Sequence, residues 1–193
     1  MEGNIRDYIL EYIYESNNAR KSVDINKIIK ISSEISKSMR SGGKLILFGN
    51  GGSAAEAQHI AAEFVGRFEK ERRALPAMAL TVNTSSLTAI GNDYSYDDVF
   101  VRQLQAFGKK GDIVMGLSTS GNSKNVVKAL IYAKENGMLI SGITGEGGGK
   151  MKDIVQEDML ITIASKRTSY IQEASLMIGH IISKLVEDEL SNE

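Results

Sequence analysis

The sequence contains only two histidines, and one of them stands four residues before a glutamate. His59 and Glu63 lie in the segment QHIAAE, within a stretch expected to be helical from Ala54 to about Phe68. A spacing of four residues puts two side chains on one face of a helix, about one turn apart. An imidazole and a carboxylate so placed could bind a metal ion together or act as an acid and a base. A simple surface contact between the two side chains is the alternative that this spacing leaves open.

The second histidine, His180, falls in a long helix predicted for Ser169–Leu190, eight residues after Gln172. Eight residues advance a helix by ~12 Å and turn it by ~80°, so Gln172 and His180 of one straight helix cannot easily hold the same small ion. If both serve one site, a second subunit is expected to supply one of them. On spacing alone, His180 is more simply a half-buried core histidine among neighbouring isoleucines.

Four hydroxyl side chains crowd the six-residue loop Ser118–Ser123 (STSGNS), directly before a helix predicted for Lys124–Asn136. The start of a helix offers unpaired backbone N–H groups and about half a positive charge. Hydroxyls add further donors, and Gly121 lets the backbone approach a ligand closely. An ordinary N-cap needs only one such side chain, so the loop is predicted to bind a phosphate. It matches neither the Walker A nor the GxGxxG pattern, which gives a nucleotide cofactor little support.

A second loop of similar character, Gly49–Ser53 (GNGGS), follows the apolar run Lys44–Phe48. Its Asn50 and Ser53 side chains can hydrogen-bond sugar hydroxyls, although the loop taken alone is equally well a structural turn. The presence of two such loops at matching strand ends strengthens the binding interpretation. The pair Asn92-Asp93 is open to two interpretations, a turn or a substrate contact.

Short apolar runs alternate with helical patterns along the chain. Strands are expected at Lys44–Phe48, Ala77–Leu80, Ile113–Leu117, Leu139–Thr144 and Met159–Ile163. Two amphipathic helices, Asn4–Ser16 and Ile25–Met39, should precede the first strand, and the second should end in a left-handed cap at Gly42-Gly43. The alternation implies right-handed βαβ crossovers and a parallel sheet, which binds ligands at the carboxyl ends of its strands.

Composition limits the class of protein further. The 193 residues are 42% hydrophobic and carry a net charge of −1, so we expect one α/β domain over 1–193, with a helical part at 1–41 and an α/β core at 44–193. The absence of cysteine excludes a disulfide framework, a thiol nucleophile and a cysteine–zinc site. The low charge, the lack of an apolar run of ~18 residues and the lack of a signal-peptide pattern predict a soluble cytoplasmic protein that binds neither nucleic acid nor membrane.

Taken together, the motifs resemble those of the sugar isomerase (SIS) domain family, and within it the phosphoheptose isomerases. The resemblance covers nearly the whole chain, and it rests on GNGGS at 49–53, QHIAAE at 58–63, Arg67-Phe68, Gly91-Asn92-Asp93, STSGNS at 118–123, and Ile171-Gln172-Glu173 with His180. It implies a single SIS domain with a flavodoxin-like parallel sheet flanked by helices. It also implies a homotetramer in which the N-terminal helices pack and the sites lie between subunits.

The same resemblance implies the residues of the site. One Zn²⁺ per subunit would be held by His59, Glu63, Gln172 and His180, and the catalytic pair would be Glu63 as the base and His180 as the acid. The substrate, a sugar phosphate, would contact Asn50, Gly51, Gly52, Ser53, Glu63, Asn92, Asp93, Ser118, Thr119, Ser120, Ser123 and Gln172.

The implied reaction converts D-sedoheptulose 7-phosphate to D-glycero-D-manno-heptose 7-phosphate through an enediolate, the first step of heptose synthesis for surface glycans. The alternative is a non-catalytic SIS scaffold that binds the replication initiator protein. Such scaffolds tend to lack the residues equivalent to Glu63 and His180, and this chain keeps both. One departure concerns sugar specificity, because Tyr170 stands where the family commonly has Arg, and Ser175 stands where it often has His.

Overall fold

Five parallel strands form the centre of the molecule. They are β1 (Leu45–Gly49), β2 (Ala77–Ala79), β3 (Ile113–Ser118), β4 (Leu139–Thr144) and β5 (Leu160–Thr162). Their order in the sheet is β2-β1-β3-β4-β5, and every neighbouring pair is parallel. All residues of β1 and β3 are buried, as expected for strands covered on both faces. The predicted α/β fold with a flavodoxin-like sheet is therefore confirmed, and each predicted strand agrees with the observed one to within one residue at either end.

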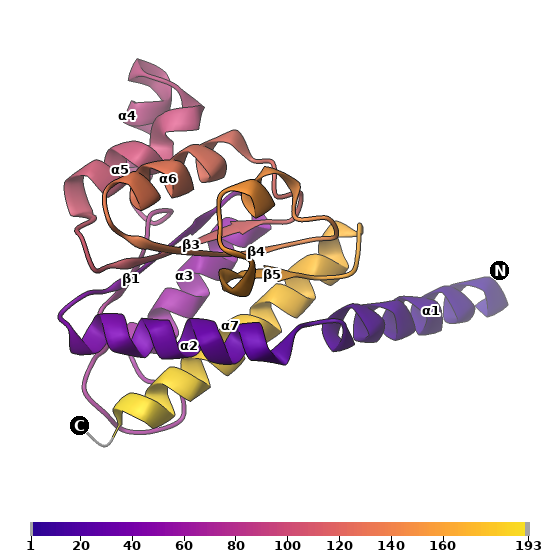
Figure 1. Cartoon of the computed structure of the whole chain (residues 1–193). Coiled ribbons are helices and arrows are strands. Elements are labelled where there is room, and N and C mark those ends of the chain that lie inside the picture. The colour runs from indigo at the N-terminus through magenta and orange to yellow at the C-terminus, as the bar shows by residue number, and fades with distance from the viewer. Residues whose placement is uncertain (1, 192–193) are drawn as a thin grey trace.

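The computed structural model describes residues 2–191, so residues 1, 192 and 193 of the predicted domain lie outside it. Its α-helices are α1 (Glu2–Lys21), α2 (Ile25–Arg40), α3 (Gly52–Val65), α4 (Thr84–Asp93), α5 (Val99–Phe107), α6 (Lys124–Glu135) and α7 (Thr168–Leu190), and its short 3₁₀ helices are η1 (Tyr96–Asp98), η2 (Gly149–Asp153) and η3 (Glu157–Met159). Figure 1 shows α5 and α6 on one side of the sheet and α2, α3 and α7 on the other. None of the helices in residues 2–191 is long and apolar enough to cross a membrane.

Helix α2 illustrates how the sequence produces an element. The Asp24 carboxylate accepts a hydrogen bond from the Asn26 N–H at 2.9 Å and so caps the N-terminus. The apolar residues Ile28, Ile31, Ile35 and Met39 are buried along one face. After Arg40 the chain turns at Gly42, whose φ of +79° is the predicted left-handed conformation.

Two helices between β2 and β3, α4 and α5, were not predicted from the sequence. No residue of α4 is fully buried, and TSSLTAIGND offers only Leu87 and Ile90, both partly buried, which is too short an apolar pattern to indicate a helix. The helix is instead started by Asn83, whose side chain accepts from the Ser86 N–H at 2.9 Å. Asn92 and Asp93 therefore lie in the last turn of α4 and not in a loop turn.

Helix α1 extends well beyond the predicted Asn4–Ser16 and projects away from the rest of the molecule (Figure 1). Its C-terminal half contacts α7, where Tyr12, Ser16 and Arg20 all donate hydrogen bonds to the Glu173 carboxylate. The apolar side chains of its N-terminal half are exposed, for example Ile5 at 61% and Ile9 at 50%. An apolar helix face of this kind is typical of an interaction surface.

Candidate functional site

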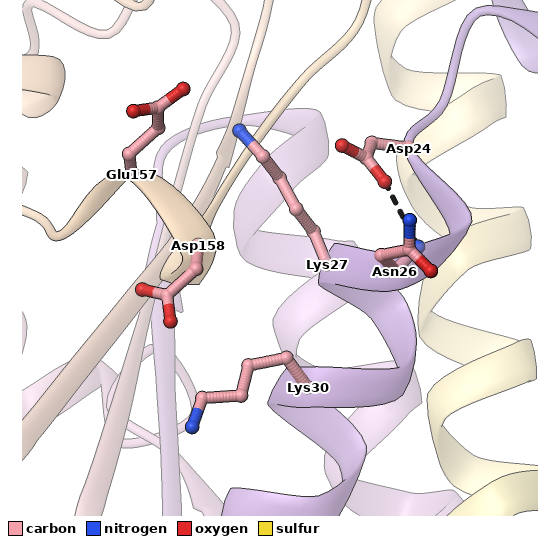
Figure 2. Close-up of a pocket in the computed structure, with 6 residues that line it drawn as sticks. All are labelled: Asp24, Asn26, Lys27, Lys30, Glu157 and Asp158. Carbon is pink, nitrogen blue, oxygen red and sulfur yellow. Dashed lines mark hydrogen bonds between the residues drawn. The ribbon is translucent and has the colours of Figure 1, made fainter.

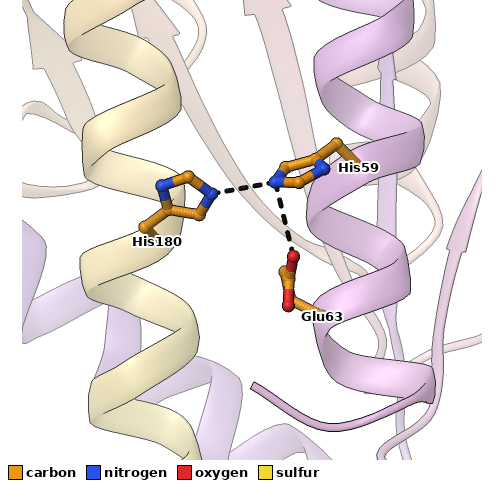
Figure 3. A group of neighbouring side chains, drawn as sticks. All are labelled: His59, Glu63 and His180. Atoms are coloured by element: carbon orange, nitrogen blue, oxygen red, sulfur yellow. Dashed lines mark hydrogen bonds and ion pairs between the residues drawn. The ribbon is translucent and has the colours of Figure 1, made fainter. Parts of the chain in front are cut away.

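The two histidines of the chain meet between α3 and α7. The Nε2 atoms of His59 and His180 are 2.8 Å apart, and the Glu63 Oε1 is 3.3 Å from the His59 Nε2. Figure 3 shows the three side chains converging from the two helices. Their ligand atoms all lie within 4.8 Å of one another. The sequence placed His59 and Glu63 on one helical face, and tertiary packing brings His180 to them in the same chain.

These three groups fit a divalent metal ion. Ligand atoms at ~2.0–2.2 Å from a tetrahedral zinc lie about 3.3 Å apart, which is close to the spacing seen here. Two histidines and one carboxylate are also a ligand set of catalytic zinc sites, which leave the fourth position open. His59 is exposed, whereas Glu63 and His180 are partly buried, so solvent reaches the centre from one side.

The close approach of α3 and α7 depends on a glycine beside the site. A Cβ atom on Gly179 would overlap the side chain of Ile60, one residue after His59. A glycine at this point allows the two helices to pack closely enough for their histidines to meet. A side chain at Gly179 would require Ile60 to shift, in the packing between α3 and α7 that brings the two imidazoles together.

The His180 imidazole is held between two other rings. Phe68 stacks on it with the ring centroids 5.8 Å apart and the planes 23° from parallel, and His59 meets it edge-on with a centroid separation of 5.1 Å. His180 is half-buried, as the core-histidine alternative expects, yet its Nε2 faces another imidazole. Its position therefore suits coordination or proton transfer.

Gln172 lies near the N-terminal end of α7, eight residues before His180. It packs against Gly52 at the start of α3, where a Cβ would collide with the Gln172 amide. With Gly52, His59 and four other residues it lines an open cavity of about 360 Å³. The helix advances ~12 Å between Gln172 and His180, so within one chain the Gln172 amide lies about 12 Å along α7 from His180.

The buried carboxyl group of Glu56, which is not among the residues that the sequence motifs indicate, also lines this cavity. It is 7% exposed and accepts a hydrogen bond from the Ser175 Oγ at 2.5 Å. Burial raises the pKa of Glu56 to about 7, and the Ser175 hydroxyl opposes that shift only in part. The sequence could have indicated that Glu56 is buried, because it falls on the same helical face as Ser53, Ile60 and other buried residues of α3.

We expect Glu56 to make stability depend on pH. Because its pKa is raised in the folded state, its contribution to stability is complete below pH ~4.3 and is lost as the pH rises through about 7. The free energy of unfolding of Glu56→Gln should therefore gain roughly 2 kcal/mol relative to the native protein between pH 5 and pH 8. Denaturant unfolding at several pH values measures this, with the exposed helical glutamate variant Glu135→Gln as the control. Parallel curves for the native protein and Glu56→Gln would contradict the prediction.

The hydroxyl loop between β3 and α6 has the features of an anion site. Ser123 occupies the N-cap position of α6, but its side chain makes no capping hydrogen bond and lies 3.0 Å from the Ser118 Oγ. Gly121 has φ +65°, and a Cβ on it would overlap the Gly148 carbonyl. Ser120 is exposed at the tip and accepts from the Asn122 N–H. The ordinary N-cap interpretation of this loop accounts for neither the Ser123 nor the Ser118 hydroxyl.

The glycine loop after β1 is joined to the first turn of α6, directly after the hydroxyl loop, by a pair of amides. Asn50 Nδ2 donates to Asn125 Oδ1 and Asn125 Nδ2 donates to Asn50 Oδ1, both at 2.9 Å. The Tyr96 hydroxyl also donates to Asn50 Oδ1 at 3.2 Å. Gly51 then starts α3 with φ +56° and ψ −121°, a conformation accessible only to glycine. Neither Asn125 nor Tyr96 was a sequence candidate, because only the sheet order brings them to Asn50.

Around Tyr170, near the start of α7, the side chains of Tyr12 and Arg167 pack against the tyrosine ring. Tyr170 is 6% exposed, and Arg167 donates to its hydroxyl at 2.8 Å while the guanidinium lies 4.7 Å above its ring. Arg167 also donates to the Tyr8 hydroxyl at 2.7 Å, which ties α7 to α1. Through these contacts Tyr170 and Arg167 hold α1 against α7.

A second groove, of about 460 Å³, lies at the N-terminus of α2 and is lined by charged side chains (Figure 2). Its lysines have structural partners, since Lys27 Nζ donates to the Leu160 carbonyl at 3.1 Å and Lys30 Nζ to Glu34 at 3.1 Å. Asp24, on the same rim, is the N-cap of α2. The Lys27 contact attaches α2 to β5 at the edge of the sheet, the other two contacts lie within α2, and the groove contains none of the candidate site residues.

Comparisons with known proteins agree with this fold and show the family to which the chain belongs. Residues 11–145 match the SIS domain family model. The chain is 56% identical over 177 residues to a probable phosphoheptose isomerase of Thermoplasma volcanium, covering 92% of this chain and 89% of that protein. It is 51% identical over 163 residues to the phosphoheptose isomerase of Rhodospirillum rubrum, covering 84% and 86% of the two chains. The structure of the phosphoheptose isomerase from Neisseria gonorrhoeae superposes with a TM-score of 0.89 at 36% identity, over 95% of this chain and 99% of the other. This chain therefore belongs to the SIS domain family, and within it to the phosphoheptose isomerases.

Proposed function

We propose that this protein is a phosphoheptose isomerase that converts D-sedoheptulose 7-phosphate to D-glycero-D-manno-heptose 7-phosphate, the first step of heptose biosynthesis. The observation that carries the proposal is the convergence of His59, Glu63 and His180 within 4.8 Å, beside an open cavity that His59 lines. Ketose–aldose isomerisation needs a base, an acid and electrostatic stabilisation of an enediolate, and these three side chains can supply the acid–base pair and hold a metal.

The Glu63 carboxylate would carry out the carbon-to-carbon proton transfer. It removes a proton from C1 of the ketose, which gives an enediolate shared by C1 and C2, and returns the proton to C2 to give the aldose. His180 would exchange the matching proton between the C1 and C2 oxygens. The carbon framework and the overall oxidation state of the sugar are unchanged, so no external reductant or oxidant is required.

The phosphate end of the substrate would lie in the hydroxyl loop. Ser118, Thr119, Ser120 and Ser123 would donate to the phosphate oxygens, assisted by the N-terminal end of α6. Asn50, held by Asn125, would contact sugar hydroxyls on the neighbouring strand end. Phosphate binding remote from the reacting carbons would orient C1 and C2 against Glu63.

The metal would be a zinc ion, one per subunit, held by His59, Glu63 and His180. A bound zinc ion would supply Lewis-acid polarisation of the carbonyl and hydroxyl oxygens. Gln172 would complete the ligand set, and because it stands ~12 Å along α7 from His180, we infer that the neighbouring subunit provides it. The exposed apolar face of α1 supports such an assembly, which we propose to be a homotetramer in the cytoplasm.

A turnover assay with D-sedoheptulose 7-phosphate tests the activity. We expect the zinc-loaded protein to form an aldoheptose 7-phosphate, chelation to lower the rate at least ~100-fold, and added Zn²⁺ to restore it. Formation of the product is measured by NMR or by a coupled aldose assay. The absence of turnover in the zinc-loaded protein would favour the scaffold alternative, whereas full turnover after chelation would overturn the metal site and leave the isomerase activity intact.

A further inference from the structure

The segment that follows α3 has no regular secondary structure and passes beside the group formed by His59, Glu63 and His180. Residues 66–76 contain no helix or strand, yet they carry Phe68, whose ring stacks on His180. An irregular segment has many conformations available, and fixing one of them requires specific contacts. The contacts in this segment converge on a single buried carboxylate from α7, that of Glu187.

Glu187 is fully buried and accepts four hydrogen bonds. The backbone N–H groups of Phe68, Glu69 and Lys70 donate to it at 2.9, 2.8 and 3.0 Å, and the Arg72 Nε donates at 3.1 Å. The two side chains of the ion pair are 2% and 0% exposed. Burial raises the pKa of Glu187, but the three amide hydrogen bonds and the charge of Arg72 outweigh it, so the pKa ends below its usual value.

Arg72 connects the same carboxylate to the end of α3. Its Nη2 donates to the Glu63 carbonyl at 2.7 Å, and its Nη1 donates to the Phe64 carbonyl at 2.9 Å. The Arg72–Glu187 ion pair thus links the backbone of Glu63 to α7. Glu187 and His180 are seven residues apart, about two helical turns, and therefore point from the same face of α7.

We propose that Glu187 and Arg72 are positioning residues for the isomerase reaction, which set the orientation of the His180 imidazole by fixing the Phe68 ring against it. Three observations support this. The Glu187 carboxylate accepts from the Phe68 N–H, the Phe68 ring stacks on His180, and His180 lies on the same face of α7 as Glu187. The inference rests on the proposed function for its catalytic meaning. The effect of the Glu187 carboxylate on the orientation of the His180 ring can be measured without any turnover.

Two variants and a neighbouring control separate positioning from general stability. Glu187→Gln keeps the size of the side chain but replaces one acceptor oxygen with an NH₂ group, which faces donors that it cannot satisfy. Phe68→Leu leaves the Arg72–Glu187 ion pair in place and removes only the flat ring, and Phe68→Tyr keeps the ring. The control is Asp188→Asn, which removes the adjacent carboxylate and its ion pairs to Lys70 and Lys184 but touches no backbone N–H of the segment.

The measurements are the ring NMR signals of His180 and the separate kcat and KM, both in the zinc-supplemented full chain. Only two histidines contribute signals, and His59→Gln assigns them. We expect the His180 ring protons to show an upfield ring-current shift that is largely lost in Glu187→Gln. In Glu187→Gln and Phe68→Leu, kcat should fall at least ~10-fold while KM changes less than ~2-fold, because only the reacting end is misaligned. Phe68→Tyr and Asp188→Asn should stay close to the native values.

An unmoved His180 signal in folded Glu187→Gln would overturn the proposal, and so would a native kcat in Phe68→Leu. If Glu187→Gln does not fold, the pair Phe68→Leu and Phe68→Tyr decides the outcome. If the native protein shows no turnover, the proposed function fails, and the His180 signal in Glu187→Gln against Asp188→Asn still decides whether the carboxylate orients the imidazole.

Discussion

Glu63→Gln and His180→Gln are each expected to lower kcat at least ~100-fold, the minimum effect of removing a general acid or base. Each variant keeps the size and hydrogen-bonding capacity of a polar side chain, and both positions are only partly buried, so the fold should be preserved. Circular dichroism and thermal unfolding check that it is. Full activity in both folded variants would contradict the mechanism.

The metal and acid–base roles of His180 compete for the same atom, because a nitrogen that binds a metal cannot donate a proton at the same time. The His180 Nε2 is the atom that faces His59. A comparison of the variants with the chelated native protein separates the two roles. If loss of zinc binding accompanies the fall in kcat in His180→Gln, the residue is chiefly a ligand; if zinc binding is retained, it acts on the substrate oxygens. His59→Gln, which removes a ligand but no proposed proton carrier, is the matched variant.

If the protein forms the proposed tetramer, mixed oligomers of two variants should regain activity only when the two substituted residues belong to different subunits of a shared site. Glu63 and His180 meet within one chain, whereas Gln172 is displaced along α7 and is proposed to act in the neighbouring subunit. Each single variant should be inactive or strongly impaired. In random hybrids of Glu63→Gln with Gln172→Ala, roughly one site in four would combine an intact Glu63 with an intact Gln172.

The experiment co-expresses two chains with different tags, isolates the hybrids by sequential affinity steps, and measures their turnover. Hybrids of Glu63→Gln with His180→Gln are the control, and they should remain inactive because no chain carries an intact pair. Recovery in this control would show that Glu63 and His180 act from different subunits. A failure of the Glu63→Gln and Gln172→Ala hybrids to recover would place the whole site in one chain.

The sequence was sufficient for the regular elements with strong periodicity and for the positions of the two glycine- and hydroxyl-rich loops at the ends of β1 and β3. Buried strands such as β3 appear as continuous apolar runs, and α2 appears as a repeat of isoleucines, because burial against a sheet imposes those patterns directly. Helix α4 has only two partly buried apolar side chains, Leu87 and Ile90, and is started by its Asn83 cap, so its sequence shows too little periodicity to predict it. The hydroxyl loop was recognisable because its unusual composition exceeds what a helix cap requires.

Within the site, the sequence by itself determined that His59 and Glu63 share a helical face, since a spacing of four residues fixes that geometry locally. It also determined that Gln172 and His180 of one helix stand apart. Only the tertiary structure decided that His180 meets His59, because that contact depends on the packing of α3 against α7 at Gly179. The role of Glu187 is likewise invisible in the sequence, where it is one of several acids near the end of α7. Its burial and its four donors arise from a segment more than a hundred residues earlier in the chain, and no local pattern encodes such a contact.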